Sequence, residues 1–298
     1  MSGPGPERQA GWLTAHGGLV NGVALGLVWL AAVSLADPYV PGSLGTAHDA
    51  HDYWLAARAT DPYAAGLSWG LPGAYVYSPA FLQVAGPLLA LPWQAFVAVW
   101  TAIALLALAW LARPGALLLM LVLAIPDVWG GNVHLLLAAA IVIGFRFPAV
   151  WAFVLLTKVT PGVGLLWFAL RREWRMLGIA AGATAAVILV SAAFAPHLWQ
   201  RWIGVLAGNA MADPIVLGVI PIPLVVRLPA AVALIAWAAP RDRRWALPVA
   251  CMLALPAWWV GGLAMLLAIP TLIHWKLPGG TPPRLRAMAR LAGFEPAT

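Results

Sequence analysis

Residues 171–195 read RREWRMLGIAAGATAAVILVSAAFA and contain the pattern that decides the fold. A basic cluster, Arg171, Arg172 and Arg175, is followed by an apolar run from Met176 to Ala195. A helix of about 20 apolar residues is long enough to cross the roughly 30 Å hydrocarbon core of a bilayer. The stretch therefore predicts a membrane span that starts at a basic loop.

The same pattern recurs along the chain, which is 63% hydrophobic and only 9% charged. Soluble domains average about 25% charged residues, so this composition excludes a soluble fold. Several runs are too short for a full crossing or are interrupted by proline, as in proteins whose broken helices line a cavity. We expect an all-α, polytopic transmembrane helical bundle of about eight to eleven membrane helices. The candidate spans are Gly18–Ala36, Pro79–Leu91, Ala95–Ala112, Gly115–Pro126, Val133–Phe145, Pro148–Thr157, Gly162–Leu170, Met176–Ala195, Ile215–Ala239, Ala246–Ala257 and Gly261–His274.

Charge gives the orientation of the bundle. The net charge of +7 comes from short basic clusters between apolar runs, which is the distribution of cytoplasmic loops and not of a nucleic-acid surface. We expect a multi-pass protein of the plasma membrane with both termini in the cytoplasm. Its single membrane domain would consist of a retained first span (18–36), an external loop (37–78), the remaining bundle (79–275) and a basic tail (276–298). Pro196–Pro214 is expected to form a second external loop.

The first external loop holds Asp49, Asp52 and Asp61, in a chain with only 10 acidic residues. We expect Ala47–Ala59 to be a short interfacial helix, whose carboxylates can act as a general base or simply as solvated or capping groups. His48 and His51 make a metal site with Asp49 conceivable, but the signal is weak and no metal is expected. Asp61 begins a turn-forming Asp-Pro-Tyr sequence.

Other polar residues stand out against the apolar background. Tyr63 and Tyr77 are either interfacial anchors or part of a cavity wall that packs against a sugar. Asn132 and His134 lie in a Gly-Asn-Val-His segment between two apolar runs, and they either bind hydroxyls or phosphate or form a structural turn.

Two cations occur inside apolar stretches. Lys158 precedes a Thr-Pro-Gly helix break, and Arg227 lies beside Pro229. A cation at membrane depth needs a partner, and a phosphate is a natural one, although a lysine can also snorkel to the interface. We expect Lys158, and second Arg227, to bind a phosphate.

The order of these motifs resembles glycosyltransferase family 87, the polytopic GT-C-type mannosyltransferases that use a polyprenyl-phosphate sugar. The similarity covers about Asp49 to Arg175. Family members often carry a Ser-Pro-x-x-Trp-x-His segment in a late helix, and here residues 255–262 contain no histidine. The motifs are an Asp-x-x-x-Tyr-Trp segment at Asp49, Asp61-Pro62-Tyr63, Tyr77-Ser78-Pro79, Gly131-Asn132-Val133-His134, Lys158-x-Thr160-Pro161 and Arg171-Arg172-x-Trp174.

The resemblance implies a function and a role for several residues. Asp49 matches the family's catalytic aspartate, Lys158 its lysine before the helix break, and Asn132 and His134 the polar positions of its loop motif. A sugar, expected to be mannose, would move from a polyprenyl-phosphate donor to a hydroxyl of a glycolipid or polysaccharide with inversion, without a cofactor. The alternatives are a non-catalytic polyprenyl-phosphate-binding or assembly protein on the same scaffold, and a small transporter.

Overall fold

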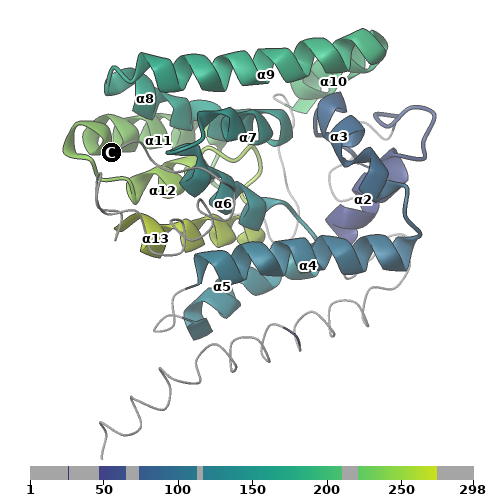
Figure 1. The fold of residues 1–298 in the computed structure, drawn as a ribbon, viewed down its shortest axis with the longest axis horizontal. Coiled ribbons are helices and arrows are strands. Elements are labelled where there is room, and N and C mark those ends of the chain that lie inside the picture. Colours follow the sequence, from purple (N-terminus) through teal and green to yellow (C-terminus); the bar gives the residue numbers. More distant parts are fainter. Residues whose placement is uncertain (1–25, 27–46, 65–73, 113–116, 210–220, 274–298) are drawn as a thin grey trace, which may run out of the picture.

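The computed structural model describes residues 26, 47–64, 74–112, 117–209 and 221–273, and every regular element in these ranges is helical (Figure 1). The all-α prediction is therefore confirmed for the described part of the chain. The expected first span (18–36) lies outside it, apart from residue 26, and so does the basic tail (276–298).

Three helices are long and apolar enough to cross a membrane. They are α4 (Trp93–Leu111), α9 (Trp174–Phe194) and the helix from Leu224 to Arg241, which joins α11 (Leu224–Ala238) to η4 (Ala239–Arg241). A fourth span is possible if α5 (Leu117–Gly130) and α6 (His134–Gly144), which meet at a bend of 119°, are counted together. The described residues thus contain three or four candidates for a full crossing, and the expected eight to eleven membrane helices also counted shorter and broken apolar helices.

The remaining apolar helices are shorter, as the proline pattern predicted. They lie largely between α4 and α9 in the view of Figure 1 and fill the interior of the bundle. Trp151 and Trp167, on two of these helices, are fully buried. The shorter elements are α3 (Pro79–Leu89), η2 (Pro148–Val150), α7 (Trp151–Thr157), η3 (Thr160–Leu165), α8 (Leu166–Leu170), α12 (Ala246–Leu253), η5 (Val260–Ala268) and α13 (Ile269–Ile273).

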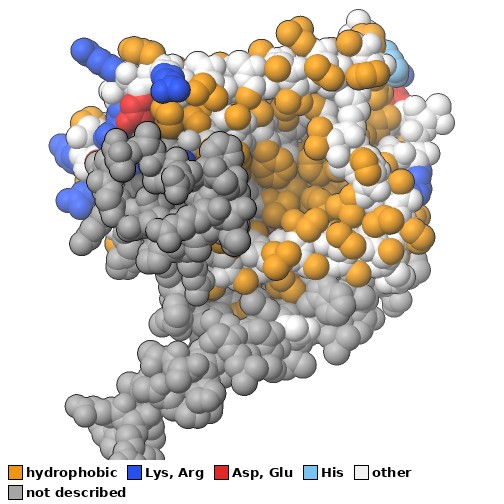
Figure 2. Space-filling model, in the orientation of Figure 1, with side chains coloured by type: hydrophobic (Ala, Val, Ile, Leu, Met, Phe, Trp, Pro, Cys, Tyr) orange, Lys and Arg blue, Asp and Glu red, His pale blue; other side chains and the backbone are white. Residues whose placement is uncertain are grey.

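The outer surface is apolar. On α9, Leu189 is 70% exposed and Phe194 is 83% exposed. Figure 2 shows hydrophobic side chains along α9 and α4, and a hydrophobic hollow between these two helices. Such a surface is unfavourable in water and compatible with lipid tails, so the chain fits a multi-pass helical membrane protein.

One sequence-based boundary is wrong, and one expected loop contains a helix. The span expected to end at Pro126 continues through this proline to Gly130, because the chain turns at the following glycines and not at the proline. The expected loop Pro196–Pro214 contains a helix, α10 (Pro196–Asn209). Its Trp202 and Val205, three residues apart, are buried while Arg201 is exposed, which is the spacing of an amphipathic helix.

Different charged contacts lie at the two ends of α9. At its start, Arg171 donates to the Ala239 carbonyl (2.8 Å) and lies 3.3 Å from the carboxylate of Asp242, which joins the two basic clusters. After its last residue the chain enters α10, whose Arg201 lies 3.3 Å from Asp61. A 21-residue helix is about 30 Å long, so these two ends are separated by about the thickness of a bilayer core.

Candidate active site

The acidic loop forms helix α2 (His48–Ala56), which confirms the short helix predicted there, and α2 rests on the bend between α5 and α6. The Ala47 backbone N–H donates to the Trp129 carbonyl at 2.6 Å. Gly131, in the bend, has a φ of 68°, and a Cβ there would lie 2.6 Å from the Cβ of Ala50. Only glycine allows both this backbone conformation and this close approach.

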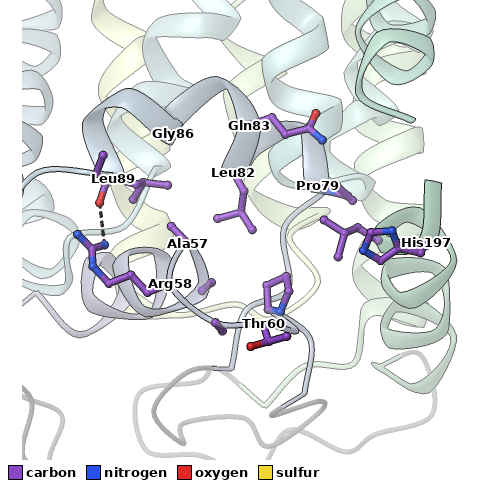
Figure 3. A pocket seen from close by; sticks show the side chains of 14 residues that line it. Ala57, Arg58, Thr60, Pro79, Leu82, Gln83, Gly86, Leu89 and His197 are labelled. Carbon is purple, nitrogen blue, oxygen red and sulfur yellow. Dashed lines mark hydrogen bonds between the residues drawn. The ribbon is translucent and has the colours of Figure 1, made fainter. Parts of the chain in front are cut away.

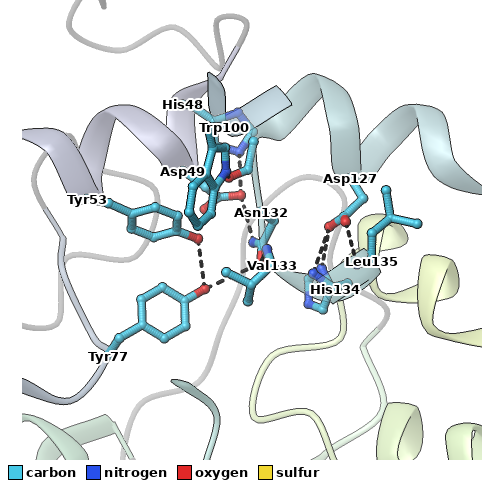
Figure 4. Close-up of polar contacts among 11 residues, drawn as sticks. His48, Asp49, Tyr53, Tyr77, Trp100, Asp127, Asn132, Val133, His134 and Leu135 are labelled. Carbon is cyan, nitrogen blue, oxygen red and sulfur yellow. Dashed lines mark hydrogen bonds and ion pairs between the residues drawn. The ribbon is translucent and has the colours of Figure 1, made fainter. Parts of the chain in front are cut away.

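Asn132, in the same bend, holds the carboxylate of Asp49 (Figure 4). Its Nδ2 donates to Asp49 Oδ2 at 2.8 Å, and His48 Nε2 lies 3.4 Å from the same oxygen. Within the described part of the chain, Asp49 Oδ1 has no hydrogen-bond partner, and the side chain is half-buried. One oxygen of Asp49 is therefore fixed while the other stays available.

The orientation of the Asn132 amide is itself determined. Its Oδ1 accepts from the Val133 backbone N–H (2.7 Å) and from the Tyr77 hydroxyl (3.3 Å), and the Tyr53 and Tyr77 hydroxyls are 3.0 Å apart. Burial raises the pKa of the Tyr77 phenol, so this group is protonated at neutral pH and can donate. The amide must then turn its N–H groups toward Asp49.

Asp127 is a site residue that sequence reasoning missed. Its side chain is buried, with Oδ1 accepting from the backbone N–H and Nδ1 of His134 (3.3 and 2.8 Å) and Oδ2 accepting from the Leu135 N–H (2.8 Å). The carboxylate thus satisfies donors at the start of α6 that no turn of that helix can satisfy. A carboxylate at the end of an apolar run was the available signal, because such groups in membrane segments mark functional sites.

Lys158, at the end of α7, belongs to the same cluster as Asp49 and Asp127. Its ammonium lies 5.2 Å from the centre of the Tyr77 ring and interacts electrostatically with Asp49 and Asp127. Among the described residues it has no ion pair within 4.0 Å and no hydrogen bond from its side chain. The structure therefore brings five of the predicted site residues together. They are Asp49, Tyr77, Asn132, His134 and Lys158.

Arg227 lies elsewhere and is already occupied. Its guanidinium donates to four backbone carbonyls, at Ile222 (2.6 Å), Leu253 (2.7 Å), Leu255 (2.7 Å) and Pro256 (3.1 Å). Three of these bonds satisfy the end of α12 and the loop that follows it, and the fourth satisfies the segment before α11. Arg227 holds the backbone in this arrangement, and only one of its five N–H groups is left for a ligand.

The other predicted residues of the acidic loop have mainly structural contacts. Asp61 Oδ1 accepts from the Tyr63 N–H (3.0 Å), as expected for the turn, and its Oδ2 pairs with Arg201. The Tyr63 hydroxyl donates to the Tyr77 carbonyl at 2.9 Å. Asp52 follows Asp49 by three residues on α2 and interacts electrostatically with the Tyr77 hydroxyl. Asp61 and Tyr63 thus support the site from outside.

A separate cavity of about 420 Å³ lies between the end of α2, α3 and the start of α10 (Figure 3). Its polar lining residues include Arg58, Gln83 and His197. Arg58 closes one side by donating to the Leu89 carbonyl at 2.7 Å. None of the five residues gathered around Asp49 lines this cavity.

In the described ranges no three His, Cys, Asp or Glu side chains converge in a way that could hold a metal ion. Comparison of the chain with family models, curated proteins and solved structures gives no match. The site must therefore be interpreted from its own chemistry.

Proposed function

We propose that the chain is a GT-C-type glycosyltransferase of the plasma membrane. It would transfer a sugar, expected to be mannose, from a polyprenyl-phosphate donor to a hydroxyl of a glycolipid or polysaccharide. The observation that carries the proposal is that two complementary groups meet at one helix bend. Among the described residues, the Asp49 carboxylate has one free oxygen and the Lys158 ammonium has no anionic partner within 4.0 Å. The resemblance of the motif order to glycosyltransferase family 87 supports the same reading.

Asp49 is suited to act as the general base. Asn132 fixes the carboxylate through Oδ2, so Oδ1 is left to accept the proton of an acceptor hydroxyl. General base catalysis of this kind contributes about 10²–10⁴-fold to a rate, provided that the carboxylate is held within hydrogen-bond reach of the hydroxyl. The contact with Asn132 supplies this positioning.

Lys158 is suited to bind the donor phosphate. A half-buried ammonium with no anion within 4.0 Å among the described residues gains a charge-assisted interaction when a phosphate binds. The same charge would stabilise the leaving phosphate as the glycosidic bond breaks. The hydrophobic hollow between α4 and α9 offers the polyprenyl chain an apolar environment (Figure 2).

The reaction balances with these two residues. The acceptor oxygen attacks the anomeric carbon while the bond from that carbon to the phosphate oxygen breaks. The acceptor proton passes to Asp49, and the electron pair of the broken bond leaves with the polyprenyl phosphate beside Lys158. Because attack and departure occur on opposite faces, the anomeric configuration inverts.

Transfer assays on purified protein in lipid nanodiscs test the proposal. Radiolabelled polyprenyl-phosphate mannose is supplied with a crude membrane-lipid acceptor, and label in the product is measured for wild type and Asp49→Asn. We expect transfer by wild type and a loss of about 10²-fold or more in the variant. Glu173→Gln, which removes a partly exposed ion pair at the opposite end of α9, is the matched control and should transfer normally.

Two results would contradict the catalytic proposal. One is the absence of sugar transfer by wild type from this donor to any fraction of the lipid acceptor, and the other is transfer by Asp49→Asn as fast as by wild type. Binding of the donor by wild type without transfer would instead favour a non-catalytic polyprenyl-phosphate-binding protein.

A further inference from the structure

His134 and Asp127 form a buried pair inside the proposed site. The side chain of His134 is 1% exposed and that of Asp127 is 0% exposed. Figure 4 shows the imidazole beside Asp127 and close to Val133 and Asn132 in the bend. The Asn132 backbone N–H also donates to the Asp127 carbonyl at 3.1 Å. Asp127 therefore holds the bend through its backbone and the ring of His134 through its side chain.

The contacts determine which nitrogen of His134 carries the proton. Asp127 Oδ1 lies 2.8 Å from His134 Nδ1, and the carboxylate also accepts two backbone N–H bonds. A carboxylate that already accepts two backbone N–H bonds is also the acceptor in its contact with Nδ1. The proton of that hydrogen bond therefore belongs to Nδ1. In the neutral ring Nε2 then carries a lone pair and is a hydrogen-bond acceptor.

His134 Nε2 has no hydrogen-bond partner in the part of the chain that the structure describes, although it is buried. Buried polar atoms without a partner are rare, and each of them calls for an explanation. The ring interacts electrostatically with Lys158 and Asp49, so it belongs to the same cluster as the proposed phosphate-binding and base residues. A ligand that spans those two residues would bring its own donors near Nε2.

We infer, resting on the proposed function, that His134 Nε2 accepts a hydrogen bond from a hydroxyl of the donor sugar. A sugar supplies several hydroxyl donors, whereas the phosphate at neutral pH supplies mainly acceptors. His134 is then a residue that recognises the sugar. Asp127 is a positioning residue, which acts through the ring of His134 by keeping the proton on Nδ1.

Nitrogen NMR of the protein labelled with ¹⁵N-histidine tests the tautomer directly. The chain has six histidines, and the signals lost in His134→Phe identify those of His134. We expect Nδ1 to be protonated and Nε2 to be unprotonated at neutral pH. Polyprenyl-phosphate mannose should shift the Nε2 signal, and polyprenyl phosphate without the sugar should not.

Donor affinity gives a second readout. His134→Phe keeps an aromatic ring but removes the acceptor, so we expect the Kd for polyprenyl-phosphate mannose to rise about 2–10-fold while the Kd for polyprenyl phosphate stays unchanged. His134→Gln, which can place an oxygen near the position of Nε2, should restore part of the affinity. Glu173→Gln is again the control.

The role of Asp127 is tested with two substitutions. Asp127→Asn can keep an oxygen acceptor at Nδ1 and should retain the tautomer, whereas Asp127→Leu cannot and should move the proton to Nε2. If Asp127→Leu does not fold, the wild-type and Asp127→Asn spectra decide, because protonated Nε2 in either would overturn the positioning role.

The remaining outcomes separate this inference from the proposed function. Binding of the sugar lipid with an unchanged Nε2 signal, or equal Kd values for wild type and His134→Phe, would overturn sugar recognition by His134 and leave the proposed function intact. If wild type binds neither lipid, the proposed function and sugar recognition both fail, and the spectrum still decides the tautomer.

Discussion

Asp49 and Asp61 belong to the same acidic loop but differ in how their carboxylates are held. Both oxygens of Asp61 have partners, the Tyr63 N–H and Arg201. Among the described residues Asp49 has partners only at Oδ2, so it retains an oxygen for chemistry. The residue type is the same, and the difference comes from which side chain lies opposite each oxygen.

Lys158→Met should weaken donor binding. If the ammonium binds the phosphate, its loss removes a charge-assisted interaction, and we expect the Kd for polyprenyl phosphate to rise about 10–100-fold. Binding can be followed by quenching of the intrinsic tryptophan fluorescence. Lys158→Arg keeps the charge and should retain most of the affinity. Equal affinity for wild type and Lys158→Met would place the phosphate elsewhere.

Ala47→Gly should stabilise the protein. Ala47 precedes α2 with φ 60° and ψ 31°, a left-handed conformation that costs an L-residue about 1–2 kcal/mol and glycine almost nothing. After the larger chain entropy of glycine is subtracted, we expect a gain of about 0.5–1 kcal/mol in the free energy of unfolding. Unfolding by SDS titration in mixed micelles measures it.

Ala56→Gly, on the same helix but in right-handed helical conformation, is the control for Ala47→Gly and should be destabilising by about 0.5–1 kcal/mol. The same sign for both substitutions would contradict a left-handed conformation at Ala47.

At the scale of elements, the bend between α5 and α6 organises the site. Gly131→Ala should disrupt it, because a methyl group at φ 68° is strained and would overlap Ala50 on α2. We expect a loss of about 1–3 kcal/mol of stability and a fall in transfer activity, since α2 carries Asp49. Thermal unfolding and the transfer assay measure the two effects.

Gly178→Ala provides the matched control for Gly131→Ala. Gly178 lies on α9, where an added Cβ meets nothing within 4 Å, and alanine there should be stabilising by about 0.5–1 kcal/mol. Normal stability of Gly131→Ala would mean that α2 does not pack on the bend.

The elements predicted best are those whose length follows from an uninterrupted apolar run. The boundaries of α4, α6 and α9 fall within two residues of the expected spans. The helix α10 was missed because its apolar residues alternate with polar ones and it was interpreted as a loop. The role of Asp127 could not be predicted, because its partners are met only after the chain bends by 119°.

At the scale of the molecule, the candidate site combines segments that are far apart in sequence: α2, the residues before α3, the α5–α6 bend and the end of α7. Sequence reasoning named most of these residues and ranked Lys158 ahead of Arg227, but it could not show that Arg227 is already occupied, since both are cations in apolar stretches near prolines. The difference lies in the carbonyls of residues 253–256, which surround Arg227 and have no counterpart around Lys158 in the described structure.

The two ends of α9 should face opposite sides of the membrane. Basic residues cluster at the start of α9, and the acidic loop with the candidate site packs at the other end, about 30 Å away. By the positive-inside rule we expect the site to face outward, where the proposed lipid-linked donor and external acceptor would meet. Single-cysteine labelling with a membrane-impermeant maleimide tests this orientation.

Cys251 is the only cysteine and is buried, so Cys251→Ala provides an unreactive background for labelling. Ala59 and Arg172 are both exposed, one at each end. We expect Ala59→Cys to react in intact cells and Arg172→Cys only after the membrane is permeabilised. Val187→Cys, within α9, should resist the reagent in both cases because Val187 packs against the buried cluster of Ala80, Ala152 and Leu156. Reaction of Ala59→Cys and Arg172→Cys from the same side would show that α9 does not cross the bilayer, and the external placement of Asp49 would fall with it.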